Sequence, residues 1–97
     1  MAGPATISRK AAETLAIQAL TYLAGEPERL ARFLASTGIS PDSLRAAARE
    51  PLFLAGVLDH LATDEVLLTD FAVQANIDPL AVGEARGVLS RKERSAS

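Results

Sequence analysis

The side chains with the clearest chemical potential in this sequence are the carboxylates of its second half. Residues 50–85 contain seven acidic residues and no lysine or arginine. By contrast, residues 1–49 have six basic and four acidic side chains, and residues 86–97 have four basic and one acidic. Charge runs are usually solvated helix faces, but an acidic surface also attracts basic partners. We therefore regard four carboxylates as candidate contacts for a protein partner: Asp59, Asp64, Glu65 and Asp70.

These residues do not have the spacing of a catalytic site. Asp64 and Glu65 are adjacent, and adjacent side chains on a helix diverge by about 100°, which makes them a poor acid–base pair. His60 is the only histidine and cysteine is absent, which excludes histidine clusters, thiolate chemistry and cysteine-based zinc sites. The sequence contains no phosphate-binding glycine loop. We expect a protein that is not an enzyme, with no cofactor and no metal ligands.

A second candidate function comes from residues 37–41, with the sequence TGISP. This segment resembles the turn of a DNA-binding helix-turn-helix, in which Arg45 and Arg49 would share the outer face of the recognition helix. Asp42 lies on the same face, the helix is short, and the net charge of the chain is −2, whereas nucleic-acid-binding domains are usually basic. We therefore expect a protein partner and keep DNA binding through Arg45 and Arg49 as the alternative.

The elements that must position these residues are helices. Alanine (19) and leucine (14) supply 33 of the 97 residues, and both lose little conformational freedom in a helix. No segment shows strand-like alternation, and the length fits one domain. We predict an all-α fold, a compact bundle of about six short helices in a single domain over residues 1–97. Its ordered core should span about residues 8–91, with short flexible ends.

Caps, prolines and glycines mark the boundaries of the six helices. The expected helices run from Ser8 to a left-handed Gly25, from Pro27 to Thr37, from Pro41 to just before Pro51, from about Pro51 to Ala62, from Thr63 or Asp64 to about Ala75, and from Pro79 to about Arg91. The fifth of them is apolar around most of its circumference, including Val66 and Val73. We therefore place this helix at the centre of the bundle.

The chain also matches itself at an offset of 38 residues. Residues 23–48 align without gaps on residues 61–86, with seven of 26 positions identical. Each copy contains a helix–turn–helix corner, where Gly38 or Asn76 suits a left-handed turn. Ile39 or Ile77 follows, and we expect each isoleucine to join the helix before it to the helix after it.

Several short motifs occur together between about Ala11 and Leu89. They are Arg32-Phe33-Leu34, Thr37-Gly38 with Ser40-Pro41 and Leu44-Arg45, Phe53-Leu54 with Val57-Leu58-Asp59, and Asp64-Glu65. In this combination the sequence resembles an uncharacterised family of short alphaproteobacterial proteins, the domain of unknown function family 3572. The resemblance implies a compact helical fold and a bacterial cytoplasm, and it brings no catalytic residue with it.

The location of the protein is expected from its hydropathy. No segment reaches the roughly twenty apolar residues that a membrane span needs. Arg9 and Lys10 precede an apolar stretch, as in a secretory signal, but polar residues interrupt this stretch with helical spacing. We expect a soluble cytoplasmic protein without membrane contact, whose oligomeric state the sequence leaves open.

Overall fold

The computed structural model describes residues 7–90, and all regular structure in this range is helical. The elements are α1 (Arg9–Ala24), α2 (Pro27–Thr37), a 3₁₀ turn η1 (Pro41–Ser43), α3 (Leu44–Ala47), α4 (Pro51–Ala62), α5 (Glu65–Ala75) and α6 (Pro79–Ser90). The predicted all-α bundle of about six helices is therefore confirmed. The ends predicted to be flexible lie outside the described residues. No helix within residues 7–90 is both long and apolar enough to cross a membrane.

Side-chain caps set the N-termini of three helices where the sequence predicted them. Ser8 Oγ and the Oδ1 atoms of Asp64 and Asp78 accept hydrogen bonds from backbone amides of the following turn, at 3.0, 3.1 and 2.9 Å. Such bonds satisfy amides that the first turn of a helix leaves unpaired. The starts of α1, α5 and α6 are therefore local properties of the sequence.

The helix C-termini differ from one another. Gly38 and Asn76 adopt left-handed conformations, with φ of 77° and 59°, as predicted. Gly25 does not, because its φ is −72°. There the last turn of α1 tightens: the Gly25 amide donates to the Tyr22 carbonyl and the Glu26 amide to the Leu23 carbonyl. These 3₁₀-type bonds satisfy the end of α1 without a left-handed residue.

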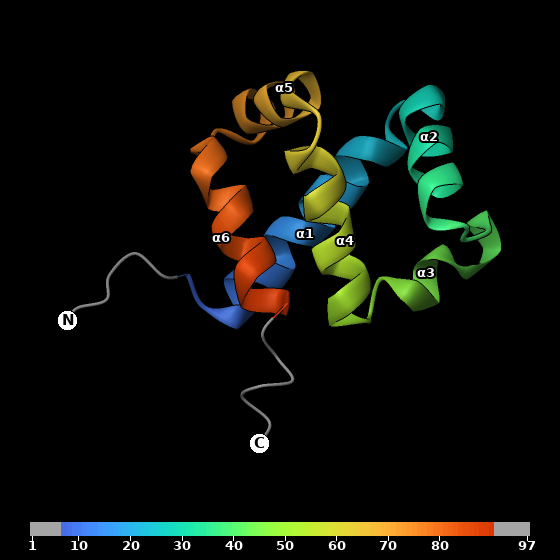
Figure 1. Cartoon of the computed structure of the whole chain (residues 1–97), viewed down its shortest axis with the longest axis horizontal. Helices are drawn as coiled ribbons and strands as arrows, with labels where there is room; N and C mark the ends of the chain where they lie inside the picture. Colours follow the sequence, from blue (N-terminus) through green and yellow to red (C-terminus); the bar gives the residue numbers. More distant parts are fainter. Residues whose placement is uncertain (1–6, 91–97) are drawn as a thin grey trace.

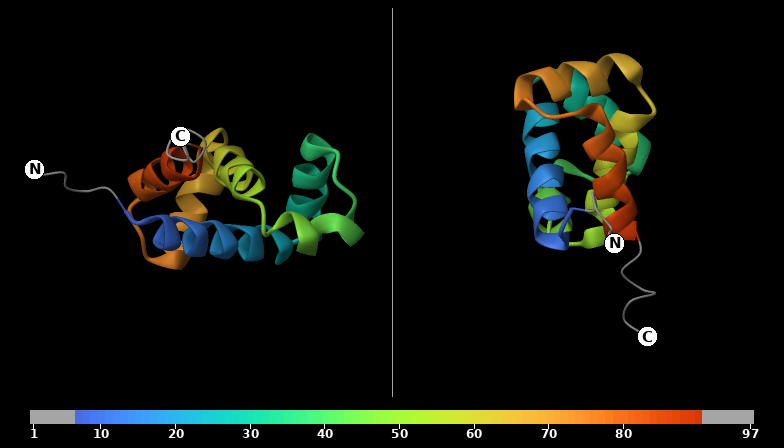
Figure 2. Two further views of the ribbon diagram at one scale, coloured as in Figure 1. Left: turned by 90° about the horizontal axis from the view of Figure 1, so that it is seen from below. Right: turned by 90° about the vertical axis from the view of Figure 1, so that its left-hand side faces the viewer.

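The centre of the bundle is built from α1, α4 and α6. In Figure 1, α4 and α6 lie at the front and α1 crosses behind them, and Figure 2 shows α1 on one side of this pair. Six of the seven largest fully buried side chains belong to these three helices: Leu23, Val57, Leu58, Leu61, Val82 and Leu89. Ala12, Ala16 and Ala19 on the inner face of α1 are completely buried. Because alanine is small, α4 and α6 can approach α1 closely.

The predicted central position of α5 is wrong. This helix lies across one end of the bundle, at the top of Figure 1, and its only buried residues are Phe71 and Ala72. The physical reason is that α1, α4 and α6 already fill the centre with their own apolar faces. A helix that is apolar all round then has only one side to bury, and the rest of its circumference faces water.

An arm formed by α2, η1 and α3 extends from one side of the bundle, at the right of Figure 1. Phe33 is the only buried residue of α2. Its ring centroid lies 5.7 Å from that of Phe53 and 5.2 Å from that of His60, both in edge-to-face geometry. The single histidine thus packs against the residue that attaches α2 to α4.

The third predicted helix is much shorter than the sequence indicated. Only a 3₁₀ turn and the four residues of α3 are helical between Pro41 and Pro51. Proline disfavours helical geometry in the residue before it, and Glu50 is accordingly extended, with φ of −92° and ψ of 123°. At the other end, the Ser40 side chain makes no capping hydrogen bond to the backbone.

The two corners of the sequence repeat are not structurally equivalent. The amide of Ile77 donates to the Ala72 carbonyl at 2.9 Å, as in a Schellman motif, which turns the residue after the cap back onto its helix. Ile77 accordingly packs against the core, whereas Ile39 is not among the residues that do so. The two isoleucines, which were expected to have the same role, therefore differ in their packing against the core.

Candidate functional site

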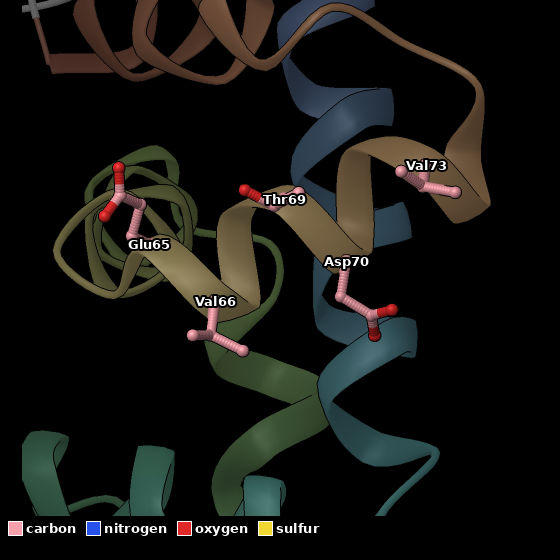
Figure 3. Close-up of a pocket in the computed structure, with 5 residues that line it drawn as sticks. All are labelled: Glu65, Val66, Thr69, Asp70 and Val73. Carbon is pink, nitrogen blue, oxygen red and sulfur yellow. The ribbon is translucent and has the colours of Figure 1, made fainter.

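An open hollow of about 440 Å³ lies along the outward side of α5. Its lining residues, which we call the α5 outer face, are Glu65, Val66, Thr69, Asp70 and Val73. Figure 3 shows these five side chains distributed along the helix. Their spacing of one, three or four residues places them on neighbouring positions of one helical surface. A single helix therefore positions the whole site.

Two aliphatic side chains run along the middle of the α5 outer face. Val66 is 77% exposed and Val73 is 73% exposed. They are seven residues apart, which is about two helical turns or roughly 10 Å along the axis. Neither valine was predicted as a site residue, because α5 was expected at the centre of the bundle with both valines buried.

The carboxylate of Asp70 is engaged on one of its two oxygens. Oδ2 accepts a hydrogen bond from the Tyr22 hydroxyl at 2.6 Å and another from Gln74 Nε2 at 3.1 Å. The same oxygen lies 3.9 Å from Nη1 of Arg29. Within the described part of the chain, Oδ1 makes no hydrogen bond or ion pair. Oδ1 is therefore the oxygen of Asp70 that residues 7–90 leave without a polar partner.

Asp70 belongs to a network that ties α5 to the start of the α2 arm. The Arg29 guanidinium stacks on the Tyr22 ring at 4.1 Å from its centroid, and the Tyr22 ring lies 5.4 Å from that of Phe71. Arg29 also pairs with Glu26 at 3.9 Å. Burial and the hydrogen bond to Asp70 raise the pKa of Tyr22, although the positive charge of Arg29 opposes them.

This network predicts an unusual titration of Tyr22, the only tyrosine in a chain without tryptophan. In a tyrosinate absorbance titration, we expect a midpoint above the ordinary pKa of about 10. Asp70→Asn should lower this midpoint, because it removes the negative charge beside the hydroxyl, and Arg29→Gln should raise it. A midpoint that stays the same in both variants would contradict the network.

The same titration has a consequence for stability. The folded protein holds the Tyr22 proton more tightly than the unfolded chain does. The resulting stabilisation is therefore fully present below about pH 10 and is lost as the pH rises through the higher pKa of the folded state. Urea melts of the parent protein and of Tyr22→Phe at several alkaline pH values isolate this contribution, because the variant lacks it.

The four carboxylates singled out in the sequence do not form one surface. Glu65 and Asp70 come together on the α5 outer face. Asp64 caps α5 through Oδ1 and does not line the hollow. Asp59 lies on α4, where Arg86 Nε is 3.8 Å from its Oδ1. Within residues 7–90, no three potential ligands gather into a possible metal site.

The arginines of the alternative function lie on the arm and not on α5. Both Arg45 and Arg49 are exposed. Arg45 is on α3 and borders a second hollow, of about 370 Å³, between α1 and α3, and Arg49 follows α3. A helix of four residues makes only about one turn. This geometry does not provide the recognition helix that the DNA-binding hypothesis needs.

The exposed aliphatic residues outside α5 are scattered. Ile17 on α1 is 41% exposed, Leu52 on α4 is 56% exposed and Leu80 on α6 is 74% exposed. None of the three lines the hollow on α5. Single exposed aliphatic residues of this kind are common on protein surfaces, so the valine pair of α5 is the better candidate for a contact.

Comparison with known proteins identifies a family for this chain but gives no activity. A family model described as Protein of unknown function (DUF3572) matches residues 9–92. No curated protein and no solved structure matches the chain.

Proposed function

The chain belongs to the DUF3572 family of proteins of unknown function, and we propose that it is a small helical module that binds another protein through the α5 outer face. The observation that carries this proposal is the exposure of Val66 and Val73 beside two carboxylates in one hollow. Burying one valine side chain contributes about 1.5–3 kcal/mol. A partner that covers both valines therefore gains a substantial binding energy.

The shape of the site supports a protein partner over a small molecule. Small-molecule pockets surround most of the surface of their ligand. The α5 outer face is instead the open side of a single helix (Figure 3). Such a surface is covered by a second secondary-structure element, with apolar residues at the centre and polar residues at the rim.

The proposed module is non-catalytic and takes no cofactor. The close titratable pair of this site, Tyr22 with Asp70, ties α1 to α5, which is a structural use of both groups. Asp64 is likewise used as a helix cap. As part of the same proposal, we place the protein in the cytoplasm of an alphaproteobacterium, which rests on the family resemblance in the sequence alone.

Site-specific photocrosslinking in cells of the source organism tests this proposal. We expect Val66→benzoylphenylalanine to form a discrete crosslink to a second protein, because this side chain lies in the hollow. Leu52→benzoylphenylalanine is the matched control, since Leu52 is also an exposed aliphatic residue near the start of a helix. The proposed surface is wrong if position 66 gives no discrete product, or if position 52 gives the same product.

A further inference from the structure

We propose that the partner of the α5 outer face is an amphipathic helix with lysine or arginine on both sides of an aliphatic stripe. This inference rests on the proposed function and adds the chemical character of the partner. Three observations support it: the order of side chains around α5, the carboxylate oxygens of Glu65 and Asp70 that lack an ion-pair partner within residues 7–90, and the negative charge of residues 50–85.

Around α5, the side chains of the outer face follow the order Glu65, Thr69, the two valines and Asp70. At about 100° per residue, Val66 and Val73 lie within about 20° of each other. Glu65 lies about 100° to one side of Val66, and Asp70 lies about 40° to the other side. Figure 3 likewise shows Glu65 and Asp70 pointing to opposite sides of the helix. The two valines thus form an apolar line with a carboxylate on each flank.

A helix is the element that matches this line. Partner helices dock through apolar anchors spaced three, four and seven residues apart. The seven-residue spacing of Val66 and Val73 is the same repeat. A helix that packs along the valines would place its flanking residues beside Glu65 and Asp70, as the flanking positions of paired helices do.

The flanking residues of the partner should be basic. Within the described residues, Glu65 makes no ion pair and Asp70 has one oxygen without a partner. Residues 50–85 contain no lysine or arginine that could neutralise this face. The cation beside it, Arg29, is engaged with Tyr22, Glu26 and Asp70. Within residues 7–90, both flanks of α5 therefore offer carboxylate oxygens without an ion-pair partner.

The negative charges of the α5 outer face disfavour two other kinds of partner. Nucleic acids and anionic lipids present phosphates, which Glu65 and Asp70 would repel. A basic amphipathic helix is attracted instead, and its contacts with exposed carboxylates weaken as salt screens them.

Two designed peptides test this inference on the full chain. Each is a fluorescein-labelled peptide of about 18 residues, which makes about five helical turns when it folds on the protein, with leucine at the heptad core positions and either lysine or glutamate elsewhere. Fluorescence anisotropy is measured at about 50 and 500 mM salt. We expect the lysine peptide to bind at least about tenfold more tightly than the glutamate peptide at low salt, because the two peptides differ in the sign of their charge.

Variants of the protein locate the binding. Val66→Ser combined with Val73→Ser should weaken the lysine peptide by about tenfold or more, because both buried valines are lost. Glu65→Gln should weaken it about two- to fivefold and reduce its salt dependence. Leu52→Ser and Glu84→Gln are the matched controls, an exposed leucine and an exposed glutamate elsewhere, and should leave binding unchanged. All of these side chains are exposed, and the helical circular dichroism should be that of the parent protein.

Three outcomes would overturn the inference. If the glutamate peptide binds as tightly and its binding depends on the valines, the surface is correct but its charge preference is wrong. If neither peptide binds, a basic amphipathic helix is not the partner, while crosslinking from position 66 still decides the proposed function. If the double valine variant binds the lysine peptide unchanged, the α5 outer face is not the binding site, and the proposed function fails with the inference.

Discussion

Truncation of Phe33 to alanine is expected to lower the free energy of unfolding by about 3–5 kcal/mol. Phe33 is completely buried and is the only buried residue of α2. Its ring packs against Phe53 and His60 of α4. The substitution therefore removes the one buried side chain of α2, η1 and α3, and α2 should open locally before the rest of the protein unfolds.

Urea melts followed by circular dichroism measure this loss, and amide hydrogen exchange locates it. We expect the amides of α2 to lose more protection than those of α4 or α6. Leu34→Ala is the control on the same helix, because Leu34 is only partly buried, and should cost less. A loss below about 1 kcal/mol for Phe33→Ala, which is the size of an ordinary surface or boundary change, would show that α2 is held mainly by another contact.

Truncation of Leu89 to alanine is expected to cost about 2–5 kcal/mol, whereas the same change at Leu80 should cost less than about 0.5 kcal/mol. Both leucines belong to α6. Leu89 is completely buried among the side chains of the core, whereas Leu80 is 74% exposed. The comparison keeps the helix and the chemical change constant and varies only the burial.

Paired urea melts of Leu89→Ala and Leu80→Ala test whether α6 belongs to the centre of the bundle. We expect a large decrease in the denaturation midpoint for the first variant and almost none for the second. Equal losses would mean that α6 does not pack through the face that contains Leu89. The central position of α5, which the sequence predicted, would then regain support.

The sequence by itself determined the fold class and most of the helix boundaries. The caps Ser8, Asp64 and Asp78 act on amides within the next turn, so their effect is local and can be predicted from spacing. Prolines at the starts of α2 and α4 act through their own backbone geometry. The same is true of left-handed Gly38. These caps, prolines and glycine act within about one turn of the chain, so they end or start a helix however the helices pack against one another.

The candidate site was only partly predictable, because some of its contacts join residues that are far apart in the chain. The sequence predicted that Glu65 and Asp70 belong to an acidic surface, because charge is a property of composition. It did not predict the contact between Tyr22 and Asp70, which are 48 residues apart, or the stacking of Arg29 on Tyr22. Such contacts depend on how α1, α2 and α5 meet, and no spacing along the chain encodes them.

The position of α5 was decided by the tertiary structure alone. Hydrophobic periodicity indicates which side of a helix is buried when one side is more apolar than the other, and α5 has apolar residues on most sides. Its burial therefore depended on the space that the other helices left. The alanines of α1 allow α4 and α6 to fill the centre, so α5 packs at one end with Phe71 inward. The side of α5 that carries Val66 and Val73 faces water for this reason, and it is the surface for which we propose a partner.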